Sequence, residues 1–143
     1  MLKVVLDTNV FVSSLLSKRG ASAQILDAWR NRSFILVVSQ EIVGEIQKVL
    51  SHPSLRERYG YAIEEVDQLV DLLEQDALHM PGRTEVSGAI PEDPEDEKFL
   101  SCALEAEADF IVSGDSHLLS IREFQGIPIL PVREFLKRLA GHS

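Results

Sequence analysis

The sequence predicts an α/β fold in which a central, mainly parallel sheet of four or five strands is covered by helices on both faces. Short apolar runs alternate along the chain with longer segments of helical periodicity. Each short run is continuously apolar, as in strands that are buried on both faces. The length of 143 residues fits a single domain, 1–143, that is large enough to bury a core.

The first half of the chain holds two of the predicted strands. The elements expected there are a strand over 2–6, a helix from about Val10, a helix over 21–31, a strand over 34–38, and a helix over 40–50 that Ser39 caps and Pro53 ends. The helix over 21–31 places Ile25, Leu26 and Trp29 on one face.

The second half repeats the alternation of helices and strands. The elements expected there are a helix over 63–78, a loop over 80–91, a helix that Asp93-Pro94 opens and that runs to about 107, strands over 109–113 and 127–130, and a closing helix over 132–139. In such a sheet the ligand site lies at the carboxyl ends of the strands, near the point where the strand order reverses.

Composition limits the classes of function that the chain can have. The net charge of -9 means that the overall field does not attract phosphate backbones, so nucleic-acid binding would need local basic patches or bound cations. The single cysteine, Cys102, excludes an internal disulfide and a cysteine-based zinc site. No apolar run reaches the roughly 20 residues of a membrane span, and the short N-terminal run is not a secretory signal. We therefore expect a cytoplasmic protein with no membrane partner.

Two aspartates follow predicted strands and should meet at one edge of the sheet. Asp7 ends the first strand, and Asp115 follows Ser113-Gly114 after the third. Each has a plainer interpretation, because Asp7 or Asn9 could cap the following helix and Asp115 could cap a short turn over 116–120.

Two further acids lie on the apolar side of helices. Glu45 is three residues after Ile42, and no lysine at a neighbouring helical position can pair with it. Asp96 precedes Phe99 by three residues, although an acid in a first turn is also favoured by the helix dipole. Asp93, before Pro94, is a natural N-cap first and a site residue second. The remaining acids of this stretch are expected on the solvated helix surface: Glu92, Glu95, Glu97, Glu105 and Glu107.

Right-handed winding of a parallel sheet should gather Asp7, Glu45, Asp96 and Asp115 at one edge. Two carboxylates ~4 Å apart repel by about 4 kcal/mol at an effective dielectric constant of 20. Four of them need a counter-charge, and oxygen ligands without histidine or cysteine select Mg²⁺ or Mn²⁺. The pattern therefore predicts a divalent metal and phosphate chemistry.

The chain resembles the PIN-domain nucleases and, among them, the VapC-type toxins of toxin–antitoxin systems. Four segments carry the resemblance, which covers nearly the whole chain: V-V-L-D-T-N-V, S-Q-E-I-V-G-E, D-P-E-D-E-K-F-L and A-D-F-I-V-S-G-D-S-H-L-L. It implies a PIN-like three-layer α/β/α sandwich and Mg²⁺- or Mn²⁺-dependent cleavage of RNA. It also implies a homodimer and a cognate antitoxin protein as partner.

The resemblance also implies roles for individual residues. The family's acidic metal-binding and catalytic residues fall on Asp7, Glu45, Asp96 and Asp115, with Asp93 as an accessory acid. Ser113 falls on a small hydroxyl residue, while Thr8 and Asn9 match the residues that shape the first turn. The stretch 55–78 is longer than in the shortest toxins, so substrate contacts there are not carried over.

Basic residues are the candidates for holding an RNA backbone, although each one singly reads first as surface charge. They are Lys18, Arg19, Arg56, Arg58 and Arg83. His117, near Asp115, is expected to be a surface histidine rather than a ligand. The alternatives are a haloacid-dehalogenase-like phosphohydrolase, which needs an aspartate where Asn9 stands, and a catalytically silent PIN-like module that binds RNA or protein.

Overall fold

The computed structural model describes residues 1–86, 88–90 and 94–141 and is built around a six-stranded sheet of order β3-β2-β1-β4-β6-β5. Its strands are β1 (Lys3–Leu6), β2 (Ile35–Ser39), β3 (Leu78–Met80), β4 (Phe110–Val112), β5 (Glu123–Phe124) and β6 (Ile127–Leu130). The neighbouring strands pair in parallel, except that β5 is antiparallel to β6. The predicted α/β class and mainly parallel sheet are confirmed, with six strands in place of the four or five expected.

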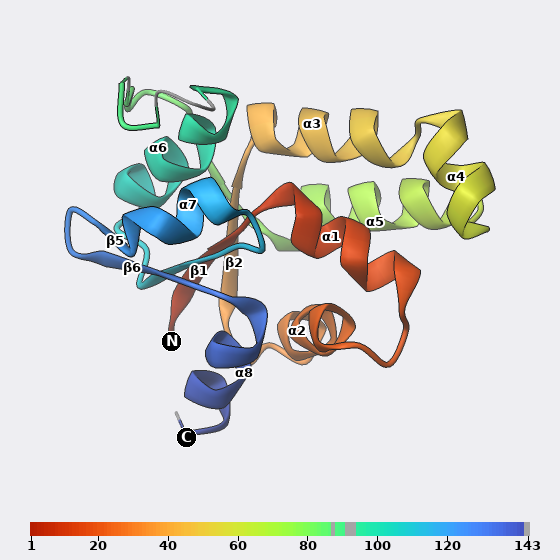
Figure 1. The fold of residues 1–143 in the computed structure, drawn as a ribbon, viewed down its shortest axis with the longest axis horizontal. Coiled ribbons are helices and arrows are strands. Elements are labelled where there is room, and N and C mark those ends of the chain that lie inside the picture. The colour runs from red at the N-terminus through yellow and green to blue at the C-terminus, as the bar shows by residue number, and fades with distance from the viewer. Residues whose placement is uncertain (87, 91–93, 142–143) are drawn as a thin grey trace.

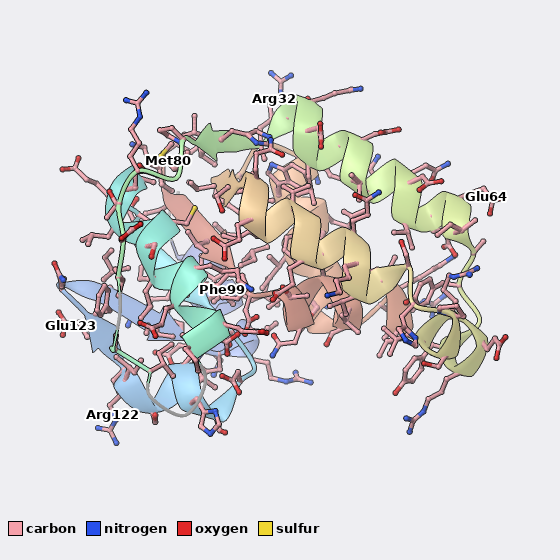
Figure 2. All side chains as sticks on the ribbon, turned by 90° about the horizontal axis from the view of Figure 1, so that it is seen from above. Arg32, Glu64, Met80, Phe99, Arg122 and Glu123 are labelled. Carbon is pink, nitrogen blue, oxygen red and sulfur yellow. The ribbon has the colours of Figure 1, made fainter. Side chains whose placement is uncertain are left out.

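Helices cover both faces of this sheet, which gives the three layers (Figure 1). They are α1 (Thr8–Leu16), α2 (Ala21–Arg30), α3 (Gln40–Leu50), α4 (Pro53–Tyr59), α5 (Ile63–Asp76), α6 (Glu97–Ala106), α7 (Ser116–Ile121) and α8 (Val132–Ala140), and the 3₁₀ turn η1 (Pro94–Asp96) leads into α6. α6 packs on β1, β2 and β4, and Figure 2 shows α3 and α5 running side by side away from it. No helix in the described part of the chain is both long and apolar enough to cross a membrane.

The core lies between the sheet and these helices. The central strands β1 and β4 contribute residues without exposed surface, among them Val4, Val5 and Ile111. Phe11 from α1 and Phe99 from α6 are also fully buried. Since both faces of the central strands are covered, the continuous apolar runs seen in the sequence are explained by burial on two sides.

α4 is a helix that the sequence analysis did not predict. Pro53 was expected only to end the helix before it, yet it also occupies the first position of α4, where its missing N–H costs nothing. His52 caps α4 by accepting from the backbone N–H of Ser54 at 3.2 Å, and Gly60 ends it in the left-handed region at φ 73°.

Two edge strands and the short α7 were also missed. Strands β3 and β5 have three and two residues, which is too short for a periodic pattern to show. The helix expected over 63–78 ends at Asp76, because Leu78–Met80 pairs with β2 instead. The segment 116–120, expected as a turn, lies within α7.

The sheet reverses its order between β1 and β4. From β1 the chain moves outward through β2 to β3, then returns to the other side of β1 for β4 and continues outward to β6. The carboxyl ends of these parallel strands share one edge, where α1, α3 and α7 begin. α6 begins there too, since it runs back toward the start of β4 (Figure 1). This reversal is the usual place for a ligand site in an open α/β sheet.

Candidate active site

Asp7 lies at the reversal point and is held toward β4. Its backbone N–H donates to the carbonyl of Val112 at 2.9 Å, which extends the pairing of β1 with β4 by one residue. Asp7 occupies the N-cap position of α1, but its side chain makes no capping hydrogen bond. Instead, Oδ2 accepts a hydrogen bond from Ser113 Oγ at 2.5 Å. Asp7 thus stands at the N-cap position, while the hydrogen bond that orients its carboxylate comes from Ser113.

Ser113 joins Asp7 to Asp115. Ser113 is completely buried, and its backbone N–H donates to the carbonyl of Leu130 at 3.0 Å. Its Oγ accepts a hydrogen bond from the backbone N–H of Asp115 at 2.9 Å. Asp115 Oδ2 in turn accepts from the backbone N–H of Leu118 at 3.2 Å. Asp115 therefore caps α7, which was the plainer interpretation of the sequence. It also lies close to Asp7, where the interpretation as a shared site would place it.

Burial raises the pKa of Asp7 above its usual value, because only 4% of the residue is exposed to solvent. The hydrogen bond from Ser113 opposes this rise in pKa, whereas the nearby negative charge of Asp115 adds to it; the backbone N–H groups of Asn9 and Thr8 also favour the charged form. Asp7 is a carboxylate that lacks a positive neighbour: among the ion pairs of the described residues, none includes Asp7 or Asp115.

Asn9 fixes the turn that carries this pair. Its Oδ1 accepts a hydrogen bond from the backbone N–H of Gly114 at 3.2 Å, so it ties the start of α1 to the loop after β4. The side chain of Asn9 is therefore occupied in joining α1 to the loop after β4, and the role that the resemblance implies for it stays a prediction.

Glu45 forms a second acidic corner at the same edge. Its Oε2 accepts from the hydroxyl of Thr8, the residue after Asp7, and its Oε1 pairs with the ammonium of Lys98 from α6. The Lys98 side chain is 9% exposed and that of Glu45 is 21% exposed. The sequence analysis looked for a partner only along the helix of Glu45, whereas the partner comes from another helix, 53 residues along the chain.

The other two acids of the predicted set are placed less fully. Asp96 is half-buried and ends η1, at the edge where α6 begins. Asp93, the predicted accessory acid, lies outside the described residues. Across 1–86, 88–90 and 94–141, no group of three or more His, Cys, Asp or Glu side chains is placed to hold a metal ion. The structure brings Asp7 and Asp115 together and Glu45 near them through Thr8, and the full ligand set stays a prediction.

Lys98 could have been suspected from its helical position. Cys102, four residues later on the same helix, is buried, and so is Phe99, so Lys98 begins the apolar side of α6. Its Nζ lies 5.7 Å from the centre of the Phe99 ring. A lysine at the border of an apolar face needs an acidic partner, although the helical position alone does not say that the partner is Glu45.

Two glutamates that the sequence analysis placed on the solvated helix surface have structural partners instead. Glu97 is buried, and its Oε2 accepts from the backbone N–H of Ala89 at 3.2 Å. Glu105 accepts from the backbone N–H groups of Gly82 and Arg83 at 2.9 and 2.8 Å. The expectation was wrong for Glu97, which Ala89 helps to cover, whereas Glu105 stays partly exposed and holds the backbone of the loop at Gly82 and Arg83. Glu95 and Glu107 are exposed as expected, and Glu92 lies outside the described residues.

The basic residues expected to hold RNA are spread over the surface. The Nζ atom of Lys18 lies 3.9 Å from Oε1 of Glu65, and Nε of Arg56 donates to the carbonyl of Ser51 at 3.3 Å. The other three residues are exposed: Arg19, Arg58 and Arg83. A hollow of about 400 Å³ instead adjoins Glu45 directly. It is lined by Glu45, Lys48, Val49, His52, Ser54, Leu55 and Glu95. The sequence analysis did not single out Lys48 or His52 as binding residues.

Comparisons with known proteins agree with this architecture. The family model for the PIN domain matches residues 3–117, which include Asp7, Glu45 and Asp115. The chain is 30% identical over 122 residues to the uncharacterized protein MJ1680 of Methanocaldococcus jannaschii, covering 85% of this chain and 76% of that protein. The reversal of the sheet, the paired aspartates at its edge and these matches lead to one conclusion: the chain belongs to the PIN-domain family, whose members are generally nucleases.

Proposed function

We propose that this PIN-domain protein is an endoribonuclease that hydrolyses RNA phosphodiesters with Mg²⁺ or Mn²⁺ at the Asp7–Asp115 edge. The observation that carries the proposal is the buried Asp7, held by Ser113 beside Asp115 at the reversal point of the sheet. Both acids offer oxygen ligands, which suit a hard divalent cation, and neither has a cationic side chain to offset its charge in the described part of the chain. The donor chemistry therefore fits such a cation.

The chain's own residues prepare the edge for hydrolysis. Ser113 orients Asp7 by donating to Oδ2 and fixes the backbone of Asp115 by accepting its N–H, so the two carboxylates keep their relative placement. Thr8 holds Glu45 close to the same edge. A divalent cation bound by Asp7 and Asp115 would supply a water of lowered pKa and offset the charge of the phosphodiester. We propose Glu45 and Asp96 as further acids of this catalytic edge, with Asp93 as accessory.

The hollow beside Glu45 supports a single-stranded substrate. Val49 and Leu55 give it apolar surface against which a base can lie, and Lys48 and His52 supply donors for phosphate or sugar oxygens. A local cation such as Lys48 is needed because the net charge of -9 repels nucleic acid. We keep Lys18, Arg19, Arg56, Arg58 and Arg83 as proposed contacts for a longer strand.

The test is cleavage of a labelled single-stranded RNA by the purified protein. We expect cleavage with Mn²⁺ or Mg²⁺ and none with EDTA, followed as fragments on a denaturing gel. Comparing the cleavage of this RNA with that of a DNA strand of the same sequence shows whether the enzyme requires the ribose 2′-hydroxyl. The matched control is Asp7→Asn, which keeps the shape of the side chain and removes its charge. Intact RNA at saturating Mn²⁺, or a fully active Asp7→Asn variant, would refute the proposal.

The same assay separates two alternatives. A haloacid-dehalogenase-like phosphohydrolase would release phosphate from a small phosphoester and leave RNA intact, but Asn9 stands where that chemistry needs an aspartate and is occupied with Gly114. A silent PIN-like module would bind RNA without cutting it. The acids that the structure describes at this edge favour the nuclease.

We further propose that the nuclease is the toxin of a toxin–antitoxin pair, that it acts in the cytoplasm and that it assembles as a homodimer. Induced expression should arrest bacterial growth in the wild type and not in Asp7→Asn, and co-expression of the product of an adjacent gene should restore growth. Light scattering coupled to gel filtration measures the dimer. Normal growth at high expression would leave a nuclease without a toxin role.

A further inference from the structure

The edge holds two acidic corners whose charges are handled differently. At one corner, Glu45 has both carboxylate oxygens engaged, with Lys98 on Oε1 and Thr8 on Oε2. At the other, Asp7 and Asp115 have hydrogen bonds but, among the residues described, no cationic side chain. The need for an external cation is therefore not equal at the two corners.

Lys98 is built into the fold rather than placed on its surface. Its side chain is 9% exposed, and its Nζ pairs with Glu45 and lies 5.7 Å from the centre of the Phe99 ring. Taking an ammonium out of water costs several kcal/mol unless an opposite charge and hydrogen bonds compensate it. If the ion pair broke, Lys98 would be a buried charge without a partner. The pair between Lys98 and Glu45 should therefore persist when other ligands bind at this edge.

Two carboxylates are enough for one cation of the expected kind. Mg²⁺ is commonly held by one or two carboxylates, with waters and substrate phosphate oxygens completing its octahedron. Asp7 and Asp115 provide that number, and Ser113 keeps them in place. A second cation that used Glu45 would have to bind where Lys98 already neutralises that carboxylate.

We propose that the ammonium of Lys98 takes the place of a second divalent cation, so that the edge binds one Mg²⁺ or Mn²⁺ through Asp7 and Asp115. This inference rests on the proposed metal-dependent function and deepens it, since it gives Lys98 a role as a positioning residue and fixed positive charge beside the reacting phosphate. Glu45 then orients Lys98 instead of binding metal.

The test counts the Mn²⁺ ions that bind to the full-length protein without RNA, by titration calorimetry and by electron paramagnetic resonance of free Mn²⁺. We expect one Mn²⁺ per chain for the wild type. Lys98→Met should bind a second, weaker Mn²⁺, because Glu45 loses its counter-charge. Lys48→Met is the matched control: it removes the same charge from an exposed lysine on the helix of Glu45, and it should bind one.

The double variant Glu45→Gln/Lys98→Met removes both charges of the pair and leaves the net charge unchanged. We expect it to bind one Mn²⁺ with a Kd within about threefold of the wild type, because neither residue holds metal, whereas loss of a metal ligand or its direct support costs tenfold or more. It also guards against misfolding, since neither partner is left buried and unpaired.

Three results would overturn the inference: two Mn²⁺ on the wild type, a single Mn²⁺ on a folded Lys98→Met, or a loss above about tenfold in the double variant. Two Mn²⁺ on a wild type that cleaves RNA would leave the proposed function standing. Absence of any bound Mn²⁺ would instead overturn the metal-dependent function and this inference together.

Discussion

The corner of Asp7 and Asp115 differs from the corner of Glu45 and Lys98 in the source of its positive charge. Both lie at the carboxyl edge of the sheet, and both hold a carboxylate that the fold shields from water. In the first, one hydrogen bond from the hydroxyl of Ser113 orients Asp7 without neutralising it. In the second, a lysine from a distant helix supplies the charge. An acid next to the core is therefore evidence for a cation, which the chain itself can provide.

The largest effect should come from neutralising the first corner. Asp7→Asn should lower the rate of Mn²⁺-dependent RNA cleavage by about 1000-fold, equivalent to ~4 kcal/mol, because it removes a charged oxygen ligand. Single-turnover cleavage measures this loss. Circular dichroism of the variant serves as the control for folding, and a loss below about tenfold would mean that Asp7 does not hold the metal.

A substitution at the second corner should change the stability of the protein. Lys98→Met leaves Glu45 partly buried and without its counter-charge, so the free energy of unfolding should fall by about 2 kcal/mol. The exposed Lys48→Met should change it by less than about 0.5 kcal/mol. Urea unfolding in EDTA measures both, and equal losses in the two variants would show that net charge, not pairing, is responsible.

The hydroxyls of the two corners give a paired comparison. Ser113→Ala frees Asp7 and leaves the N–H of Asp115 without its acceptor, so the affinity for Mn²⁺ should fall about tenfold. Thr8→Val removes the hydroxyl that donates to Glu45, and the Mn²⁺ affinity should stay within about threefold of the wild type. If Thr8→Val weakens Mn²⁺ binding as much as Ser113→Ala, Glu45 is a metal ligand after all.

The smallest effect concerns pH in the absence of metal. Because burial raises the pKa of Asp7, the folded protein binds this proton more tightly than the unfolded chain. The contribution to stability is present at pH values below the ordinary pKa of an aspartate and is lost as pH rises through the raised pKa of Asp7. In EDTA, Asp7→Asn should therefore melt at a higher temperature than the wild type at neutral pH, and the gap should close in acid.

The positions of Asp7 and Asp115 could be predicted because a strand end in a parallel sheet has a definite place. A buried apolar run followed by an acid puts that acid at the carboxyl edge, whatever the packing of the helices. The lengths of α2, α3 and α8 followed equally from local periodicity and capping. These features depend on residues that are close together in the chain, and hydrophobic periodicity and capping patterns report only on such neighbours.

Lys98 and Glu97 could not be placed in this way. The partner of Glu45 lies on a helix 53 residues away, and only packing decides that the two meet. Glu97 is a charged residue of the kind usually found on the surface, yet it is buried, and its carboxylate accepts a hydrogen bond from the backbone N–H of Ala89. The short strands β3 and β5 depend in the same way on pairing partners supplied by the rest of the sheet.

One oxygen of Asp115 joins the candidate site to a helix of only six residues. The amide of Leu118 donates to that carboxylate, so the first turn of α7 relies on the orientation of the Asp115 side chain. A helix this short has little stability of its own. Any ligand that turns the carboxylate will loosen or tighten this turn, so the rate of hydrogen–deuterium exchange at the Leu118 amide would report whether the site is occupied, without any substrate.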